Sequence, residues 1–287
     1  MSKRLMLVDG PNLAWRSIHA IRPGNSFEGA TGPLVLFVRA LSKYVREVGP
    51  DELVVCWEGG KSEFRTRIYS EYKANRGPSG HPLRDSAFTM IQSFLALCRI
   101  SQARVRGFEA DDLIAALWRT YHDRRVTILS SDKDLLQLVS DRSEQIRLGG
   151  GGADTDLWTV EDVRREYGCE PEDLPRLMAI TGDRGDNVPG ITGMGPKKAL
   201  KALENYGWDL EENSHPAVSR HRDQVLLSHR LVNLRDPEEV PDVSQIPLEF
   251  DPVSGEEDPD FRVLGYFLLA NQLQDLYNRS RQGTLWH

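Results

Sequence analysis

Acidic side chains recur along this 287-residue sequence at positions from which they could bind metal ions. The nine candidates are Asp9, Glu58, Glu109, Asp111, Asp112, Asp132, Asp134, Asp183 and Asp186. Carboxylates gathered in one place repel one another, and divalent cations relieve that repulsion. An all-oxygen ligand set suits Mg²⁺ or Mn²⁺, and the few histidines lie outside these clusters, which argues against zinc. Each acid taken singly is as readily a helix cap as a ligand, so the prediction depends on their convergence.

Short apolar runs predict the strands that would bring these acids together. Residues 4–8, 53–57 and 126–129 are continuous apolar stretches typical of buried strands, and 103–106 is a candidate for a shorter one. Helical patterns alternate with them, at 34–48, 109–121 and 135–139. This alternation predicts an α/β domain with a mainly parallel sheet. Four of the acids follow strand ends, where open α/β sheets bind ligands, and three more begin the helix at 109.

The stretch from Ile180 to Leu200 reads as two helices joined by a Gly- and Pro-rich hairpin. Its glycines allow positive φ and close backbone approach, and Pro196 suits the first position of the second helix. A helix N-terminus with lysines in its first turn binds phosphate. This helix-hairpin-helix pattern is typical of proteins that bind the backbone of duplex DNA without reading bases. The DNA-binding candidates here are Gly190, Gly193, Gly195, Lys197 and Lys198.

A basic and aromatic stretch lies between the second strand and Arg84. Six basic residues oppose two acidic ones from residue 60 to 84, and three aromatic residues are interleaved with them. Cations alternating with aromatic rings suit single-stranded nucleic acid, by attraction to phosphates and by stacking on bases. Arg65 and Tyr72 are candidates for such contacts, although a solvated basic helix face is the simpler alternative. The whole segment from 60 to about 102, which lies between two predicted strands, is long enough to be functional.

Composition sets the broad class. The net charge of −7 at first argues against nucleic acid, but the nine candidate acids account for all of it, and bound cations would offset part of their charge. The three cysteines have no metal-type spacing and suggest a reducing compartment. No apolar run resembles a signal peptide or a membrane span, so we expect a cytoplasmic protein with no membrane partner. Gly149–Gly152 lacks a phosphate-loop pattern and is interpreted as a turn.

Five ordered motifs resemble those of the 5′-nuclease superfamily, which comprises flap endonucleases, bacteriophage 5′→3′ exonucleases and the 5′-nuclease domain of bacterial DNA polymerase I. They are Val8-Asp-Gly, Tyr72-Lys-Ala-Asn-Arg76, Glu109-Ala-Asp-Asp112, Ser131-Asp-Lys-Asp134, and Thr181-Gly-Asp-Arg-Gly-Asp-Asn-Val-Pro-Gly190 with its Gly-Met-Gly-Pro-Lys continuation. The resemblance covers residues 4 to about 206. One position departs from the family pattern, because Glu58 stands where the family usually has Asp.

The resemblance implies a fold, a reaction and roles for individual residues. The fold is a PIN-like, mainly parallel sheet flanked by helices, with a helical arch at about 60–102. The reaction is hydrolysis of DNA phosphodiesters with two Mg²⁺ ions, for which Mn²⁺ can substitute. The nine acids would bind these ions, Lys73 and Arg76 would contact the scissile phosphate, and Tyr72 would stack on a terminal base. The hairpin would hold downstream duplex and bind K⁺. A 5′ single-stranded flap or end would pass through the arch.

The resemblance also implies an organisation of the chain and leaves alternatives open. We expect a catalytic domain at 1–150, a helix-hairpin-helix subdomain at 151–245, and a C-terminal helical segment at 246–287 with a helix at 260–278. The family expectation is a monomer, and the absence of a polymerase region suggests a standalone enzyme. The alternatives are a DNA-binding relative with weak catalysis and a PIN-type ribonuclease, which would lack the hairpin. A structural protein with a coincidental acidic patch is a third.

Overall fold

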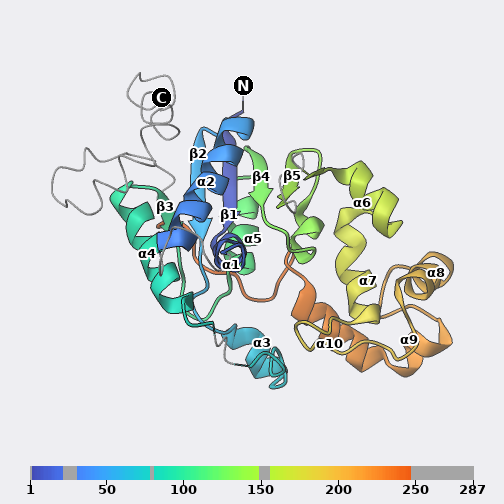
Figure 1. Ribbon diagram of the computed structural model, residues 1–287. Helices are drawn as coiled ribbons and strands as arrows, with labels where there is room; N and C mark the ends of the chain where they lie inside the picture. Colours follow the sequence, from blue (N-terminus) through green and yellow to red (C-terminus); the bar gives the residue numbers. More distant parts are fainter. Residues whose placement is uncertain (1, 22–30, 78–80, 149–155, 247–287) are drawn as a thin grey trace.

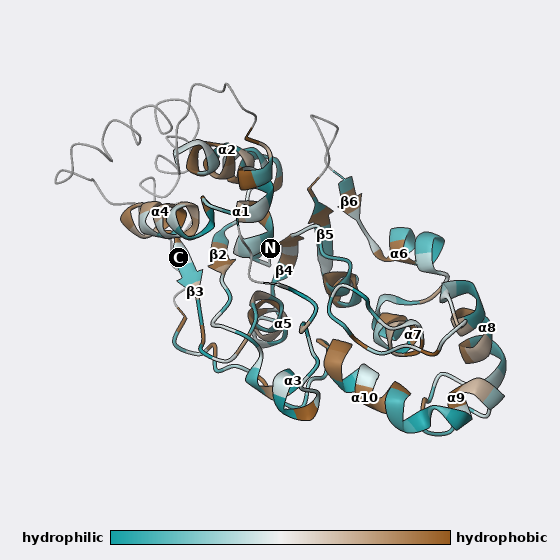
Figure 2. Ribbon diagram, turned by 60° about the horizontal axis from the view of Figure 1, so that its bottom comes forward, coloured by the Kyte–Doolittle hydropathy of each residue, from teal (hydrophilic) through white to brown (hydrophobic). Residues whose placement is uncertain are grey.

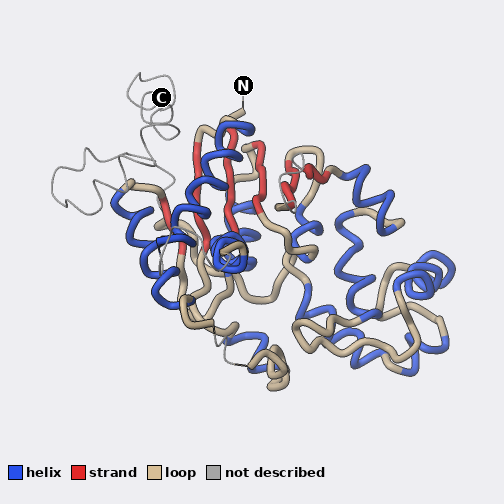
Figure 3. The backbone as a smooth tube through the Cα atoms, viewed as in Figure 1, coloured by secondary structure: helices blue, strands red, loops and turns tan. Residues whose placement is uncertain are grey.

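The computed structural model describes residues 2–21, 31–77, 81–148 and 156–246. A six-stranded sheet forms its centre, with strand order β3-β2-β1-β4-β5-β6 (Figures 1 and 3). The strands are β1 (Arg4–Asp9), β2 (Glu52–Cys56), β3 (Ser101–Ala103), β4 (Arg125–Leu129), β5 (Ser143–Arg147) and β6 (Asp156–Trp158). Every pairing is parallel except the antiparallel pair of β5 and β6.

Helices cover both faces of this sheet. On one face lie α1 (Gly10–His19), α2 (Thr31–Val48) and α4 (Arg84–Leu97), and on the other lies α5 (Ala110–Thr120). The central strands are buried on both faces, which explains their continuous apolar sequences. Successive residues of β1 point to opposite sides, so that Met6 packs with the first helix group and Leu7 with α5.

A second group of helices follows β6 and encloses its own apolar cluster (Figure 1). It contains α6 (Val160–Tyr167), α7 (Leu174–Thr181), α8 (Pro196–Tyr206), α9 (Pro216–Arg220) and α10 (Arg222–Val232). Figure 2 shows hydrophobic and hydrophilic residues side by side on α8 and α10, as expected for helices with one buried face. Past α10 the chain returns to the sheet, where Leu234 and Val243 pack with the α5 cluster.

The structure confirms the predicted α/β class and most of the predicted elements, with several differences. The short third strand lies at 101–103 rather than 103–106, and 134–138 is a 3₁₀ helix. Strands β5 and β6 were not predicted from the sequence. Helix α4 packs in the core through Ile91, Phe94 and Leu95, so it belongs to the helix layer and not to an arch at 60–102.

Some sequence-based expectations lie outside the described residues. They are the turn at Gly149–Gly152, the helix at 260–278 and almost all of the C-terminal segment 246–287. Among the residues that the structure describes, no helix has the length and apolar character needed to cross a membrane.

Candidate active site

The carboxyl ends of β1 and β4 bring the first acids together. These two strands are neighbours at the point where the strand order reverses, the position at which α/β sheets form ligand sites. Asp9 ends β1 and also caps α1, since its Oδ1 accepts a hydrogen bond from Asn12 N at 3.0 Å. The buried Ser130 hydroxyl donates to Asp9 Oδ2 at 2.6 Å and accepts from Asp132 N at 3.0 Å. Asp9 is therefore both a helix cap and a member of the acidic group.

Two amide side chains fix the loop that carries Asp132. Gln145 of β5 is fully buried, and its Nε2 donates to the carbonyls of Ser130 and Asp132 at 3.0 and 2.7 Å. Asn12 Oδ1 accepts from Ser131 N at 3.1 Å. Sequence reasoning missed Gln145, Asn12 and Ser130 as supporting residues. The Asp-Gly-Pro-Asn and Ser-Ser-Asp strings pointed to two of them, but nothing in the sequence singles out Gln145.

Four acids of the site form no ion pair with any residue that the structure describes, and the pKa of each is raised. Burial, reinforced by Asp132 and Glu58, raises the pKa of Asp9 to about 7. Burial followed by the charges of Asp132 and Asp9 raises the pKa of Asp111 well above its usual value. The pKa of Asp134 rises to about 8 through burial and then Asp132, and burial also raises the pKa of Asp132. The charge of Asp132 thus acts on Asp9, Asp111 and Asp134, which places these three acids near it.

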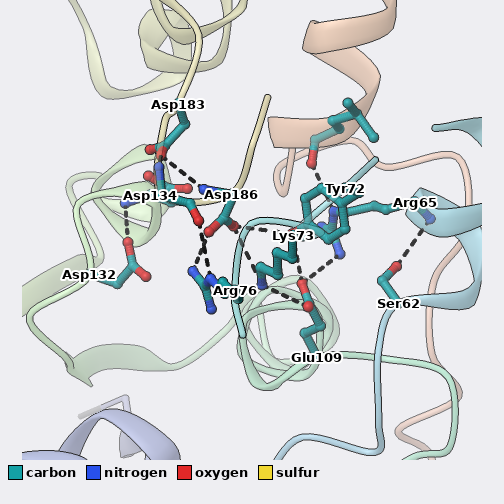
Figure 4. Close-up of polar contacts among 12 residues, drawn as sticks. Ser62, Arg65, Tyr72, Lys73, Arg76, Glu109, Asp132, Asp134, Asp183 and Asp186 are labelled. Atoms are coloured by element: carbon teal, nitrogen blue, oxygen red, sulfur yellow. Dashed lines mark hydrogen bonds and ion pairs between the residues drawn. The ribbon is translucent and has the colours of Figure 1, made fainter. Parts of the chain in front are cut away.

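Basic side chains neutralise the acids on the other side of the site (Figure 4). Lys73 Nζ lies 2.7 Å from Glu109 Oε1 and 3.4 Å from Asp186 Oδ2. Burial alone would lower the pKa of Lys73, but these two carboxylates raise it. Arg76 forms an ion pair with Asp186. Lys73 and Arg76 belong to the basic stretch at residues 60–84, called the basic segment below. These two residues, which were expected to contact phosphate, therefore approach the acids from that segment.

Asp183 has its own cationic partner. Lys133 Nζ lies 2.6 Å from Asp183 Oδ2. Burial alone would raise the pKa of Asp183, but the hydrogen bond and charge of Lys133 lower it. Asp183 and Asp186 thus come beside Asp134, and each is held by a cation. Glu58, in contrast, is exposed and lies at the rim of the site, where its charge contributes to the raised pKa of Asp9.

Arg65 differs from its expected role as a DNA contact. Its guanidinium is buried and donates to Asp112 through Nη1 and Nη2 at 2.9 and 2.7 Å. Its Nε donates to Leu231 O at 2.8 Å, and Nη1 lies 3.4 Å from Glu109 Oε2. These contacts leave the guanidinium no exposed donor face for DNA. They also occupy both Asp112 oxygens, so Asp112 supports the site as a partner of Arg65 and does not fit its predicted place as a metal ligand.

Tyr72 also differs from its expected role. The side chain is 5% exposed, and its hydroxyl donates to Glu109 Oε2 at 2.9 Å and lies 3.2 Å from Asp186 Oδ2. The ring packs in a small cluster with Val188 and Leu231. A ring buried in this way has no free face on which a terminal base could stack. Tyr72 instead orients Glu109, which receives donors from three side chains in total.

The basic segment is fastened to the turn that carries Asp183 and Asp186. Lys73 N donates to Asp186 O at 2.9 Å, and Lys73 has a positive φ of 54°, which is uncommon for a residue with a side chain. Asn75 Nδ2 donates to Arg184 O, and Asn187 Nδ2 donates to Glu71 O, each at 2.6 Å. The segment that begins with α3 (Glu63–Ile68) thus reaches across to the second group of helices.

The hairpin depends on a close backbone approach at Gly190. A Cβ there would lie 2.2 Å from Thr181 O, which requires glycine, and Ile191 N donates to Ile180 O at 2.8 Å. Gly193 has a φ of 80° in the turn itself. Gly193, Gly195, Lys197 and Lys198 are all exposed. The hairpin therefore presents backbone and ammonium groups at the surface, in the arrangement that the sequence predicted.

The donor set fits divalent cations, although its geometry is not that of a closed metal cluster. Within the described ranges, no three His, Cys, Asp or Glu side chains are arranged as a group that could hold an ion. Asp9, Asp111, Asp132 and Asp134, which form no ion pair within the described part of the chain, offer hard oxygen ligands of the kind that Mg²⁺ binds. Asp134 Oδ1 is buried without a hydrogen-bond partner, which is costly unless something binds it.

Comparison with known proteins identifies the family. Residues 4–168 match the model of the 5′-3′ exonuclease N-terminal resolvase-like domain. A 5′-3′ exonuclease of Aquifex aeolicus is 33% identical over 243 residues, which cover 81% of this chain and 82% of that protein. The thermostable DNA polymerase I of Thermus aquaticus is 33% identical over 278 residues, 92% of this chain but only 31% of that protein.

The fold agrees with a solved relative. A flap endonuclease of bacteriophage T5, solved in a complex with DNA and metal ions, has a TM-score of 0.66 and 23% identity, covering 81% of this chain and 90% of that one. The sequence matches include the strands and helices that carry the acidic residues up to Asp134. The chain therefore belongs to the 5′-3′ exonuclease family, within the 5′-nuclease superfamily.

Proposed function

We propose that this chain is a structure-specific 5′-nuclease, a 5′→3′ exonuclease and 5′-flap endonuclease that hydrolyses DNA phosphodiesters in replication or repair. The observation that carries the proposal is that Asp132 lies near Asp9, Asp111 and Asp134, that none of these four acids has an ion-pair partner among the described residues, and that Lys73 lies beside Glu109 and Asp186. Two Mg²⁺ ions, or Mn²⁺ in their place, would be held by Asp9, Asp111, Asp132 and Asp134 with Asp183, Asp186 and Glu58 around them. Bound there, such ions supply an activated water and stabilise charge on the attacking and leaving oxygens.

The basic side chains would bind the scissile phosphate and offset the charge that develops on it. The Lys73 side chain is 12% exposed and lies between Glu109 and Asp186, so its ammonium is positioned before substrate arrives and reorganises little. Arg76 is half-exposed and can turn from Asp186 to a phosphate oxygen at modest cost. Tyr72 and Arg65 hold Glu109, which in turn holds Lys73. Lys73 and Arg76 are thus the proposed phosphate contacts, and Arg65 and Tyr72 support them.

The hairpin would bind duplex downstream of the cleaved bond. Lys197 and Lys198 lie in the exposed first turn of α8, where backbone N–H groups and ammonium groups together favour phosphate. Ser228 and Gln224 already donate to the carbonyls of Pro189 and Gly190, so a K⁺ ion at the hairpin would have to use its other carbonyls. The preferred substrate would be DNA with a 5′ single-stranded flap or end next to duplex, bound by a monomer.

The test is cleavage of a labelled 5′-flap substrate in Mg²⁺ and in EDTA. The double variant Asp132→Ala with Asp134→Ala should abolish cleavage and keep most of the DNA affinity, whereas Asp141→Ala, at an exposed acid, should cleave as the wild type does. Cleavage retained by the double variant would remove this acidic group from the mechanism. Binding of the flap without cleavage by the wild type would favour a weak relative, and preferential cutting of single-stranded RNA would favour a PIN-type ribonuclease.

A further inference from the structure

We propose that Arg65 is a positioning residue that sets the spacing between the duplex-binding hairpin and the catalytic acids, and thereby selects which phosphodiester is cut. The inference rests on the nuclease function proposed above. Arg65 is 5% exposed and lies where the basic segment, α5 and the end of α10 meet. Its Nε bonds to Leu231, which is 166 residues away in sequence, and its Nη1 and Nη2 bond to Asp112, which is 47 residues away.

Helix α10 connects the hairpin to Arg65. Near its start, Gln224 Nε2 donates to Gly190 O at 2.9 Å, and past its middle Ser228 Oγ donates to Pro189 O at 2.6 Å. Near its end, Leu231 O accepts from Arg65 Nε at 2.8 Å. Two turns of helix separate Gln224 from Leu231, a rise of about 10 Å along the axis. Because a helix of this length is stiff, a displacement of the hairpin along α10 is transmitted to the guanidinium of Arg65.

The other side of the guanidinium connects to the catalytic side chains. Asp112 receives both terminal nitrogens of Arg65, and its Oδ2 also accepts from Glu109 N at 2.9 Å. Glu109 then binds Lys73 Nζ at 2.7 Å. Lysine could not replace arginine here, since an ammonium is a point charge without the planar fork that binds a carboxylate and a carbonyl at fixed angles. In this series of contacts from the hairpin to Lys73, Arg65 is thus the residue whose role requires a guanidinium.

The fold does not depend on Arg65 alone to hold α10 in place. Gln137, fully buried, donates to Val232 O at 3.1 Å and accepts from Leu234 N at 2.8 Å. Arg119 Nη1 donates to Leu234 O at 2.5 Å. These contacts attach α10 to the part of the chain that forms the sheet. Gln137 Nε2 also donates to the backbone carbonyl of Asp134 at 2.6 Å, but none of these contacts bonds to an acidic side chain of the site. Replacement of Arg65 by lysine should therefore leave the domains attached while loosening the spacing between hairpin and active site.

The experiment measures where the enzyme cuts. Under single-turnover conditions in Mg²⁺, a 5′-flap substrate labelled on the downstream strand should give Arg65→Lys products at two or more adjacent positions in place of one dominant position. We expect the rate to fall by up to about a hundredfold, because a misplacement of about 1 Å can cost that much. The duplex Kd should change by less than about twofold, because no exposed cation is lost. The matched control is Arg67→Lys on the same helix, where an exposed arginine pairs with Glu239.

A second variant keeps the test decisive if Arg65→Lys does not fold by circular dichroism. Ser228→Ala removes a hydrogen bond at the hairpin end of the same path, and it should also spread the products. Combined with Arg65→Lys it should add little further spread, since both act through α10. Products confined to the wild-type position in the folded variants, whatever their rate, would overturn the positioning role. A wild type that cuts no flap would instead overturn the proposed function.

Discussion

Removing one buried carboxylate should stabilise the metal-free protein. Asp134 is the clearest case, because burial and the charge of Asp132 raise its pKa to about 8 and its Oδ1 has no hydrogen-bond partner. An acid whose pKa is raised on folding keeps its proton more tightly in the folded chain than in the unfolded one. The stability that this tightly held proton gives the folded chain is fully present below about pH 4 and is lost as pH rises toward 8. Asp134→Asn abolishes that loss, since the amide does not titrate.

The magnitude follows from the pKa values of Asp134 in the folded and unfolded chain. Between pH 5 and pH 7.5 the unfolded carboxyl ionises freely while the folded one stays mostly protonated, which lowers the wild-type free energy of unfolding by about 3 kcal/mol. The advantage of Asp134→Asn over wild type should grow by that amount across the same range. Adding Mg²⁺ at pH 7.5 should reduce the advantage, because an ion bound at 100 times its Kd stabilises the folded state by about 2.7 kcal/mol.

Guanidinium denaturation in EDTA at pH 5, 6.5 and 7.5 measures this difference directly. Asp141→Asn is the control, because Asp141 is exposed and its substitution should change stability by less than about 0.5 kcal/mol at every pH. Parallel stability curves for wild type and Asp134→Asn would refute the reasoning. So would a variant that is less stable than wild type at pH 7.5 without metal.

Three further predictions concern catalysis, binding and folding. Lys73→Ala should lower the single-turnover cleavage rate at least a hundredfold and barely change DNA affinity, because its ammonium is placed at the acids; equal losses of both would make it only a binding residue. Lys197→Ala with Lys198→Ala should weaken duplex binding and reduce the salt dependence of log Kd by about two, measured by titration at several salt concentrations; an unchanged salt slope would exclude them as phosphate contacts. Gly190→Ala should destabilise the protein by about 2 kcal/mol or more in chemical denaturation, because its Cβ meets Thr181 O at 2.2 Å; full stability would contradict that contact.

Much of the active site could be predicted from the sequence because its signals are local. Asp9 and Asp132 follow buried strands, and the carboxyl ends of parallel strands share an edge whatever the details of packing. The hairpin is equally local, since Gly190, Gly193 and Pro196 determine its turn and the start of α8 through backbone geometry alone. These local features therefore predict the fold class and the class of metal ion that the acids would bind.

The roles of Arg65, Tyr72 and Gln145 depended on contacts between distant parts of the chain. In sequence, Arg65 and Tyr72 are one cation and one ring in a basic stretch, and nothing local separates a DNA contact from a buried support. The tertiary structure decides between them, because it brings Leu231 and Asp112 to Arg65, and Glu109 to Tyr72. Burial makes an unpaired charge costly, so each buried member must have its partner. Local sequence thus predicted which residues would carry the chemistry, whereas long-range packing determined which of them are buried supports and which remain available for a substrate.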